Sequence, residues 1–205
     1  NQALGVSTNK AVLTNSSMIA TQNNLIISND VDVVTSATFD TLANTFTVAG
    51  RIDGGAVTKT GQGTLVLTAT NNQNATTVSQ GTLRVSDNSA LGAANAVLTL
   101  NGGTFESAVT QSYARDVALG TTGGTVNTLD TTTTTLTQTV SGDGALNKTG
   151  TGTLVLTGQN TYKGGTNLTA GKLVVNQAAN LGQTANISIG TATLETTANM
   201  ALQDV

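Results

Sequence analysis

Short segments along the chain alternate apolar and polar residues, and Gly-rich or Asn-rich turns separate one segment from the next. Thr64–Leu67 and Thr82–Val85 place an apolar side chain at every second position, which is the period of a β-strand with one buried face. Turn-forming pairs such as Gly102-Gly103 and Gly164-Gly165 lie between such segments. No segment shows a helical period with capping residues. The pattern therefore predicts an all-β protein with no substantial helix.

A long internal repeat organises these segments. The block Lys59–Thr68 returns as Lys148–Thr157, an offset of 89 residues (148 minus 59). Further along, Gly81–Val85 matches Gly171–Val175 at an offset of 90, so one extra residue lies in the intervening turn. Because the flanks recur together with the block, we interpret the block as a structural rung of the fold and not as a unique site.

A unit of this length is too long for one solenoid repeat, and we interpret it as several coils of about 20 residues each. The whole chain, 1–205, is then one continuous β-solenoid of roughly ten coils. It divides into a partial unit at 1–47, unit A at about 48–136 and unit B at about 137–205, which is incomplete at its C-terminal end. We expect Leu, Val and Ile to stack inside, with Thr and Asn decorating the outside.

The composition excludes several classes of function. The chain has no Cys and no His, so it can form neither a disulfide framework nor the common zinc sites, and it has no Ser-His-Asp arrangement. Charged residues are only 9% of the chain, and the net charge of −3 provides no basic face for nucleic acid. No apolar run approaches the roughly 20 residues of a membrane-spanning helix. We expect no cofactor.

Three groups of residues could suggest chemistry. Gly165–Lys172 superficially resembles a phosphate loop, but its spacing is one residue too long and Leu173 replaces the Ser or Thr that would hold magnesium. Asp53 and Asp143 lie in turns that could bind calcium, although single carboxylates rarely fill six to eight oxygen positions. The five-threonine run 131–135 is interpreted as an exposed, Thr-rich strand. We predict no metal site.

Glu106 and Glu195 are the carboxylates that an enzyme of the glycosidase type would need. They occupy equivalent positions in the two units, 89 residues apart, so we expect them to recur along the rod instead of converging. The chain also has no Trp to stack on a sugar ring. We therefore predict no catalytic residues and no enzymatic activity.

The second copy of the repeat resembles a known family. Gly144–Leu154, Gly158–Thr166 and Ala170–Leu173 together are similar to the autotransporter passenger-associated β-strand repeat. The first copy departs from it at 69–74, where the Tyr and the Gly pair of the second copy are missing. The resemblance implies a right-handed parallel β-helix in the secreted passenger of a Gram-negative surface protein.

The resemblance implies a stalk function rather than chemistry. We expect an extracellular segment that is exported through the periplasm, stays at the bacterial cell surface and acts as a rigid stalk for adhesion or self-association. Self-association could be head to tail or side by side, and other partners could be host surfaces or polysaccharides. One alternative is the subunit of a self-assembling extracellular filament or sheath, since the chain begins and ends inside a repeat. A carbohydrate-active β-helix enzyme is a further alternative. Residues 1–10 do not form a signal peptide, so we expect one to have been removed or the chain to be an internal fragment.

Overall fold

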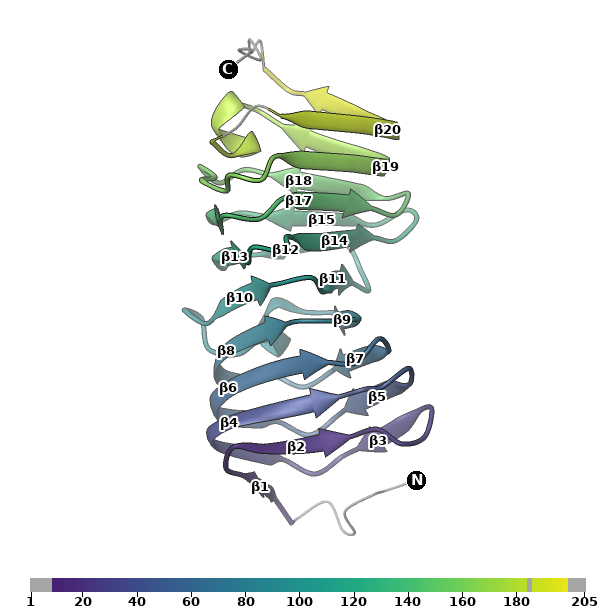
Figure 1. Ribbon diagram of the computed structural model, residues 1–205, viewed down its shortest axis with the longest axis vertical. Coiled ribbons are helices and arrows are strands. Elements are labelled where there is room, and N and C mark those ends of the chain that lie inside the picture. The colour runs from purple at the N-terminus through teal and green to yellow at the C-terminus, as the bar shows by residue number, and fades with distance from the viewer. Residues whose placement is uncertain (1–8, 184–185, 199–205) are drawn as a thin grey trace.

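The computed structural model describes residues 9–183 and 186–198, and it shows one parallel β-solenoid of about nine turns (Figure 1). Every strand pairing within these ranges is parallel, which confirms the predicted all-β solenoid. The only helical segments there are two 3-10 turns of four residues, η1 (Asn88–Leu91) and η2 (Ala178–Leu181). The predicted count of roughly ten coils is close to the observed number.

The strands are short, as the alternation predicted. In the N-terminal part they are β1 (Ala11–Leu13), β2 (Ser16–Ile19), β3 (Leu25–Ile27), β4 (Val31–Asp40), β5 (Thr45–Val48), β6 (Ile52–Thr60), β7 (Thr64–Leu67), β8 (Asn72–Val78), β9 (Thr82–Val85) and β10 (Val97–Leu100). In the C-terminal part they are β11 (Thr104–Ser107), β12 (Gln111–Tyr113), β13 (Val117–Leu119), β14 (Gly124–Thr128), β15 (Thr133–Leu136), β16 (Val140–Gly142), β17 (Leu146–Thr149), β18 (Thr153–Leu156), β19 (Thr166–Val175) and β20 (Ile187–Thr196).

Successive coils stack their strands in columns parallel to the rod axis. The β6 column runs through β4, β6, β8, β10, β13 and β16 in one sheet. The β7 column runs through β3, β5, β7, β9, β11, β14, β17 and the first part of β19, and the β12 column runs through β12, β15, β18 and the second part of β19. Both belong to the second sheet because β19 bends from one column into the other.

Apolar side chains fill the interior in register from coil to coil. Along the β7 column, Phe46 pairs with Leu65, Leu65 with Leu83, and Leu83 with Phe105. All four side chains are at most 1% exposed. Since each inward residue packs against its equivalents in the coils below and above, stability comes from contacts between neighbouring coils.

Threonines occupy the outward positions of the same strands. One straight row on the β7 column consists of Thr45, Thr64, Thr82, Thr104 and Thr125, each in register with the next. These residues are half-buried because each one shields its neighbours. Cross-strand Thr pairs stabilise a sheet modestly, and β-branched side chains fit its pleat. This row places part of the threonine content on the outside, as expected, whereas Thr76, Thr128, Thr134 and Thr166 lie inside the rod, contrary to that expectation.

Candidate functional site: the buried lysine turns

The lysine of the repeated block lies inside the rod in both units. Lys148 follows Val126 in the apolar inward row of the β7 column, and Leu168 lies on its other side. Lys59 lies between Phe39 and Val78 in the β6 column. Both lysine side chains are fully buried. Side chains of a β-strand alternate between its two faces. Each lysine lies two residues from a buried residue of its own strand, so it also points into the rod.

The ammonium group of Lys148 closes the corner between two strands. Its Nζ donates to the carbonyl oxygens of Thr149 at 2.8 Å and Gly150 at 2.7 Å, both in the turn after β17. A third bond, at 3.1 Å, reaches the carbonyl oxygen of Ala170 in the next coil. The lysine therefore satisfies three backbone acceptors and links two coils at once.

Lys59 makes the same contacts in unit A. Its Nζ donates to the carbonyl oxygens of Thr60 and Gly61, both at 2.7 Å, and to that of Gln80 in the next coil at 3.1 Å. A fourth bond, of 2.8 Å, goes to Thr41 Oγ1 in the coil below. The two turns are thus structurally equivalent, as the repeat predicted.

Burial changes the acidity of both lysines but does not expose them to a substrate. Loss of water around the ammonium group lowers the pKa of Lys59 to about 8, against a smaller raising effect of Asp40, and lowers the pKa of Lys148 to about 8. A lysine with a lowered pKa can act as a nucleophile when a substrate reaches its nitrogen. Here each nitrogen is enclosed by carbonyl oxygens of the turn, so its role is to hold the corner.

The glycine after each Lys-Thr pair is required by the turn. Gly61 and Gly150 both have φ of +74°, a left-handed conformation that other residues adopt at a cost. A Cβ on Gly150 would lie 2.1 Å from the carbonyl oxygen of Thr128, and one on Gly61 would lie 2.4 Å from the backbone nitrogen of Leu42. The glycines that superficially suggest nucleotide binding thus allow two coils to approach closely.

A buried asparagine joins three coils in each unit, which differs from the expected outward placement of Asn. In unit B, Asn160 Oδ1 accepts from the Val140 amide at 2.7 Å, and its Nδ2 donates to the Asn180 carbonyl oxygen at 2.6 Å. In unit A, Asn71 makes the equivalent bonds, at 2.8 Å each, to the Ile52 amide and the Ala90 carbonyl oxygen. These amides are buried because backbone groups at the first residue of a strand, such as Val140, and in the 3-10 turns, such as Asn180, need partners inside the rod.

The first repeat copy accommodates its missing tyrosine with a smaller hydrogen-bonding side chain. Tyr162 is fully buried, and its hydroxyl lies 2.6 Å from Thr166 Oγ1. Gln73 occupies the equivalent place, and its Nε2 donates to Thr76 Oγ1 at 3.1 Å. Its Oε1 is buried without a hydrogen-bond partner. The departure in sequence therefore weakens local hydrogen bonding but leaves the coil intact.

The aspartates considered for calcium lie beside cations. Asp53 pairs with Arg51 at 2.6 Å, and Asp143 pairs with Lys163 at 2.8 Å. The hydrogen bond from Lys163 lowers the pKa of the Asp143 carboxyl below its usual value. Within 9–183 and 186–198, no three His, Cys, Asp or Glu residues gather as a metal site would need.

The two candidate catalytic glutamates do not converge. Glu106 is paired with Arg84 on the strand below and accepts from Asn127 on the strand above. Glu195 pairs with Lys172 at 2.7 Å. Four strand spacings, about 19 Å, separate β11 from β20 along the axis, whereas glycosidase carboxyls lie within about 10 Å of each other. The carboxylates stabilise neighbouring rungs.

The other two motifs are part of strands. Thr166–Val175 is the strand β19, so the glycine-rich stretch that resembles a phosphate loop forms a turn followed by a strand. In the threonine run, Thr131 has a left-handed φ of +62°, and β15 begins at Thr133. Thr134 points inward and is fully buried, so the predicted exposed strand is only partly correct.

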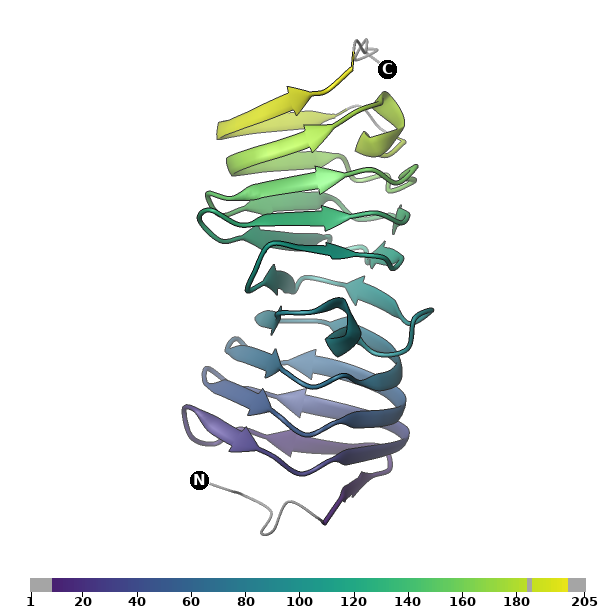
Figure 2. The same ribbon diagram turned by 180° about the vertical axis from the view of Figure 1, so that it is seen from behind.

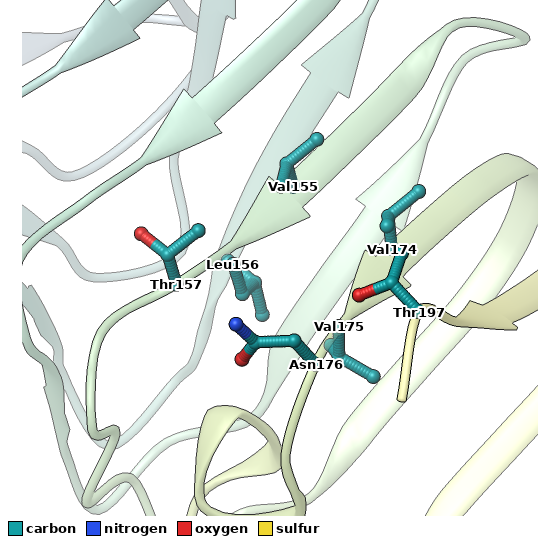
Figure 3. A pocket seen from close by; sticks show the side chains of 7 residues that line it. All are labelled: Val155, Leu156, Thr157, Val174, Val175, Asn176 and Thr197. Atoms are coloured by element: carbon teal, nitrogen blue, oxygen red, sulfur yellow. The ribbon is translucent and has the colours of Figure 1, made fainter. Parts of the chain in front are cut away.

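A small notch opens beside β18 and β19, as Figure 3 shows. Its volume is about 110 Å³. It is lined by Val155, Leu156, Thr157, Val174, Val175, Asn176 and Thr197. Sites for small organic ligands usually have volumes of about 300–1,000 Å³, so this notch is too small for such a ligand. Its lining also contains no titratable side chain.

A buried arginine is a residue whose structural role the sequence analysis did not predict. Arg115 is 3% exposed, and its guanidinium donates to the carbonyl oxygens of Asn88 at 2.7 Å and of Leu91 and Ala96 at 3.0 Å. It therefore ties the coil after β12 to the η1 turn. Its partners lie 19 to 27 residues away in the sequence and have no recognisable pattern.

Comparison with known proteins agrees with this structural interpretation. Residues 57–85 and 146–175 match the passenger-associated-transport-repeat, and they contain both lysine turns. The chain carries two passenger-associated-transport-repeats. This confirms the resemblance to the autotransporter passenger repeat family. The two matches begin 89 residues apart (146 minus 57), the offset of the internal repeat.

The repeat chain is also similar to a segment of a much larger protein. Over 133 residues, 64% of the chain, it is 38% identical to the adhesin BmaC autotransporter of Brucella suis biovar 1 (strain 1330). The matched region spans about 4% of that protein's length. No solved structure matches the chain. Within the described residues, no helix has the length and apolar character needed to cross a membrane.

Proposed function

We propose that this segment is a rigid spacer in the passenger of a bacterial surface protein. The observation that carries the proposal is the unbroken stacking of about nine turns, with apolar rows inside and threonine rows outside. Nine spacings of about 4.8 Å make a rod about 43 Å long. The passenger repeats and the similarity to an adhesin support a place at the cell surface.

Export through the periplasm is part of the same proposal. The absence of cysteine suits that route, because no premature disulfide can form in an oxidising compartment. Protease shaving of intact cells, followed by immunoblotting, would test the location. Cleavage on intact cells is expected, and a chain protected in intact cells but cleaved in lysed cells would contradict the proposal.

Shortening the rod in register tests the spacer role. Val57 and Val140 occupy the same place in the β6 column, four coils apart. Deleting 57–139 from the native protein therefore joins Ala56 to Val140 with the strand pairing preserved. It shortens the rod by about 19 Å. We expect reduced attachment of cells to their target surface, with unchanged export.

A matched surface variant separates a spacer from a contact surface. Thr64→Ala and Thr82→Ala change two outward, half-buried side chains and leave the length unchanged. A spacer loses attachment in the deletion variant and keeps it in the double alanine variant. Full attachment in the deletion variant, or loss in the alanine variant, would refute the spacer role.

The threonine rows support a secondary proposal of adhesion or self-association along the sides of the rod. The row Thr45, Thr64, Thr82, Thr104 and Thr125 is uncharged and regularly spaced, and the charged residues beside it, Arg84 and Glu106, neutralise each other, so a second rod can lie along this face. Sedimentation velocity over a range of concentrations would show side-by-side dimers. A constant sedimentation coefficient would exclude them.

We also propose that the segment has no enzymatic activity of its own. The separation of Glu106 and Glu195 supports this. The double variant Glu106→Gln, Glu195→Gln is expected to leave any activity of the native protein unchanged. A loss of activity without unfolding would contradict the proposal.

A further inference from the structure

A polar depression opens on the surface near the C-terminal end of the rod. Its volume is about 340 Å³, and it is lined by Gly164, Asn167, Asn186, Ile187 and Ser188. These residues belong to the turn before β19 and to the segments where β19 and β20 begin, the light-green and yellow strands at the upper end of the rod in Figure 2. Sites for small organic ligands usually have volumes of about 300–1,000 Å³, so this depression is large enough for such a ligand, whereas the notch beside β18 is not.

The side chains of this surface differ between the two units. In unit B, one outward row that runs across three neighbouring strands consists of Asn147, Asn167 and Ser188. The equivalent row of unit A consists of threonines only, namely Thr58, Thr77 and Thr99. The buried lysine and the buried asparagine, in contrast, are the same in both units. The amides of the outward row are therefore not required by the coil, which forms with threonines in their place.

A glycine pair exposes backbone beside these amides. The one extra residue of unit B lies here, since 163–165 replaces 74–75 of unit A between the equivalent hydrogen-bonded side chains. Gly165 has a left-handed φ of +79°, and a Cβ on it would lie 2.7 Å from the carbonyl oxygen of Asn186. The turn therefore needs glycine, and no side chain from Gly164 or Gly165 fills the depression.

The polar groups of the depression are oriented but not satisfied. Asn167 Nδ2 donates to Asn147 Oδ1 at 2.8 Å, and Asn147 Nδ2 donates to the carbonyl oxygen of Gly124 at 3.3 Å, so both amides have a fixed orientation. Within 9–183 and 186–198, no group donates to Asn167 Oδ1, and the side chains of Asn186 and Ser188 form no hydrogen bond. All three residues are exposed. They offer acceptors and donors that a ligand can reach without displacing an internal bond.

The charge and the apolar content of the depression indicate the class of ligand. No charged side chain lines it, and the charge of the adjacent Lys163 is offset by Asp143 at 2.8 Å. A neutral ligand is therefore favoured over an ion. Hydroxyl groups and a secondary amide would pair with the two asparagines and the serine, and a methyl group would contact Ile187. An N-acetylated amino sugar carries all of these groups on one ring.

We propose that this depression binds an N-acetylated amino sugar. The use of such a sugar as an attachment target rests on the proposed surface role, whereas the binding itself does not. No aromatic side chain lines the depression, so the sugar ring gains no stacking contact. The affinity for a single sugar is therefore low, with a dissociation constant of about 1–10 mM.

A titration with two matched sugars tests the proposal. Di-N-acetylchitobiose and cellobiose have the same linkage and differ only in the acetamido groups, which replace two hydroxyls. Added to the isotope-labelled chain, di-N-acetylchitobiose should shift the side-chain amide signals of Asn167 and Asn186 in NMR spectra. Cellobiose should bind at least about tenfold more weakly, because it lacks the amide and the methyl group. Equal binding of the two sugars, or no shift with di-N-acetylchitobiose at about 20 mM, would overturn the proposal.

Side chains of unit A provide the variant. Asn167→Thr with Asn186→Val introduces the residues found at the equivalent positions, Thr77 and Val97, which the same strand pairing already accommodates. Binding of di-N-acetylchitobiose should weaken at least about tenfold, and the control Thr77→Ala should bind like the wild type. Unchanged affinity in the double variant would overturn the proposal, and Asn186→Val alone repeats the test if the double variant does not fold.

The titration also separates the sugar site from the spacer role. It is performed on the purified chain, where the length of the rod does not affect the result. A spacer without a sugar site would fail the titration and would still lose attachment when 57–139 is deleted. A sugar site without a spacer role would pass the titration and keep full attachment after that deletion.

Discussion

Removing the buried amide of Asn160 should destabilise the rod by more than any surface substitution. In Asn160→Ala, the Val140 amide loses its acceptor and the Asn180 carbonyl oxygen loses a donor. Both groups lie in the interior, where Val140 and Asn180 are fully buried. A buried polar group left without a partner costs about 1–3 kcal/mol, so the two groups together give a loss of about 2–6 kcal/mol.

Urea unfolding followed by circular dichroism measures this loss. A domain is typically stable by about 5–15 kcal/mol, so the shift in midpoint should be large. The control is Asn95→Ala, which changes an exposed asparagine in the turn before β10 and should cost less than about 0.5 kcal/mol. Asn71→Ala removes the equivalent amide of unit A and should behave like Asn160→Ala.

Hydrogen exchange locates the effect. The Val140 amide should exchange much faster in Asn160→Ala than in the wild type, since its acceptor is gone. Amides several coils away should change less, because each coil contacts only its neighbours. The reasoning is refuted if Asn160→Ala unfolds at the same urea concentration as Asn95→Ala and the Val140 amide stays protected.

Three further outcomes concern the buried lysines and Tyr162, the left-handed Gly150 and the buried Arg115. The pKa of lysine is 10.5 in the unfolded state, whereas the pKa values of Lys59 and Lys148 are about 8 in the folded state. Between pH 8 and 10.5 the unfolded state therefore binds more protons than the folded state. The free energy of unfolding should rise with pH over this range. Burial raises the pKa of Tyr162 from 10.0 to about 12, so above pH 10 the folded state holds more protons and stability should fall. Thermal unfolding across about pH 7–11 should show both the rise due to the lysines and the fall due to Tyr162. A flat profile would contradict both. Gly150→Ala should cost more than about 2 kcal/mol in urea unfolding, because its Cβ meets backbone at a left-handed φ, and an unchanged midpoint would contradict the close approach. Arg115→Met should increase protease cleavage at the η1 turn while distant coils stay resistant, and unchanged cleavage would show that the guanidinium does not hold that turn.

The sequence predicted the architecture because the signals for it are local. Alternation in Thr64–Leu67 and the recurrence of the lysine block were sufficient for the strands, the stacking and the family. The inward position of Lys59 is consistent with its place two residues after the buried Val57, but lysine is rarely buried and the sequence analysis did not assign it a side. Burial of Arg115 could not be predicted, since it depends on where a distant turn lies after folding. The division of the chain into units at about 48 and 137 stays a prediction.

Each strand of unit B stacks one column further round the rod than its equivalent in unit A, as β17 and β18 do relative to β6 and β7. Four coils of about 20 residues amount to about 80 residues, so an offset of 89 leaves several residues over and is compatible with such a shift. Which column each strand joins depends on the length of every turn, and individual coils differ in length by several residues. Only the strand register in the structure, such as the pairing of Val126 with Lys148, assigns each strand to its column.

The inter-coil register also determines how the rod responds to force. Hydrogen bonds between coils run along the axis, so tension applied through the chain opens them a few at a time at the end of the stack. Each coil that peels away releases about 20 residues, or about 70 Å of extended chain. A rod attached at the cell surface and pulled by flow would therefore lengthen in small steps and absorb mechanical work, while the remaining coils keep their structure. If the same hydrogen bonds form again when the force is released, the extension of the rod is reversible.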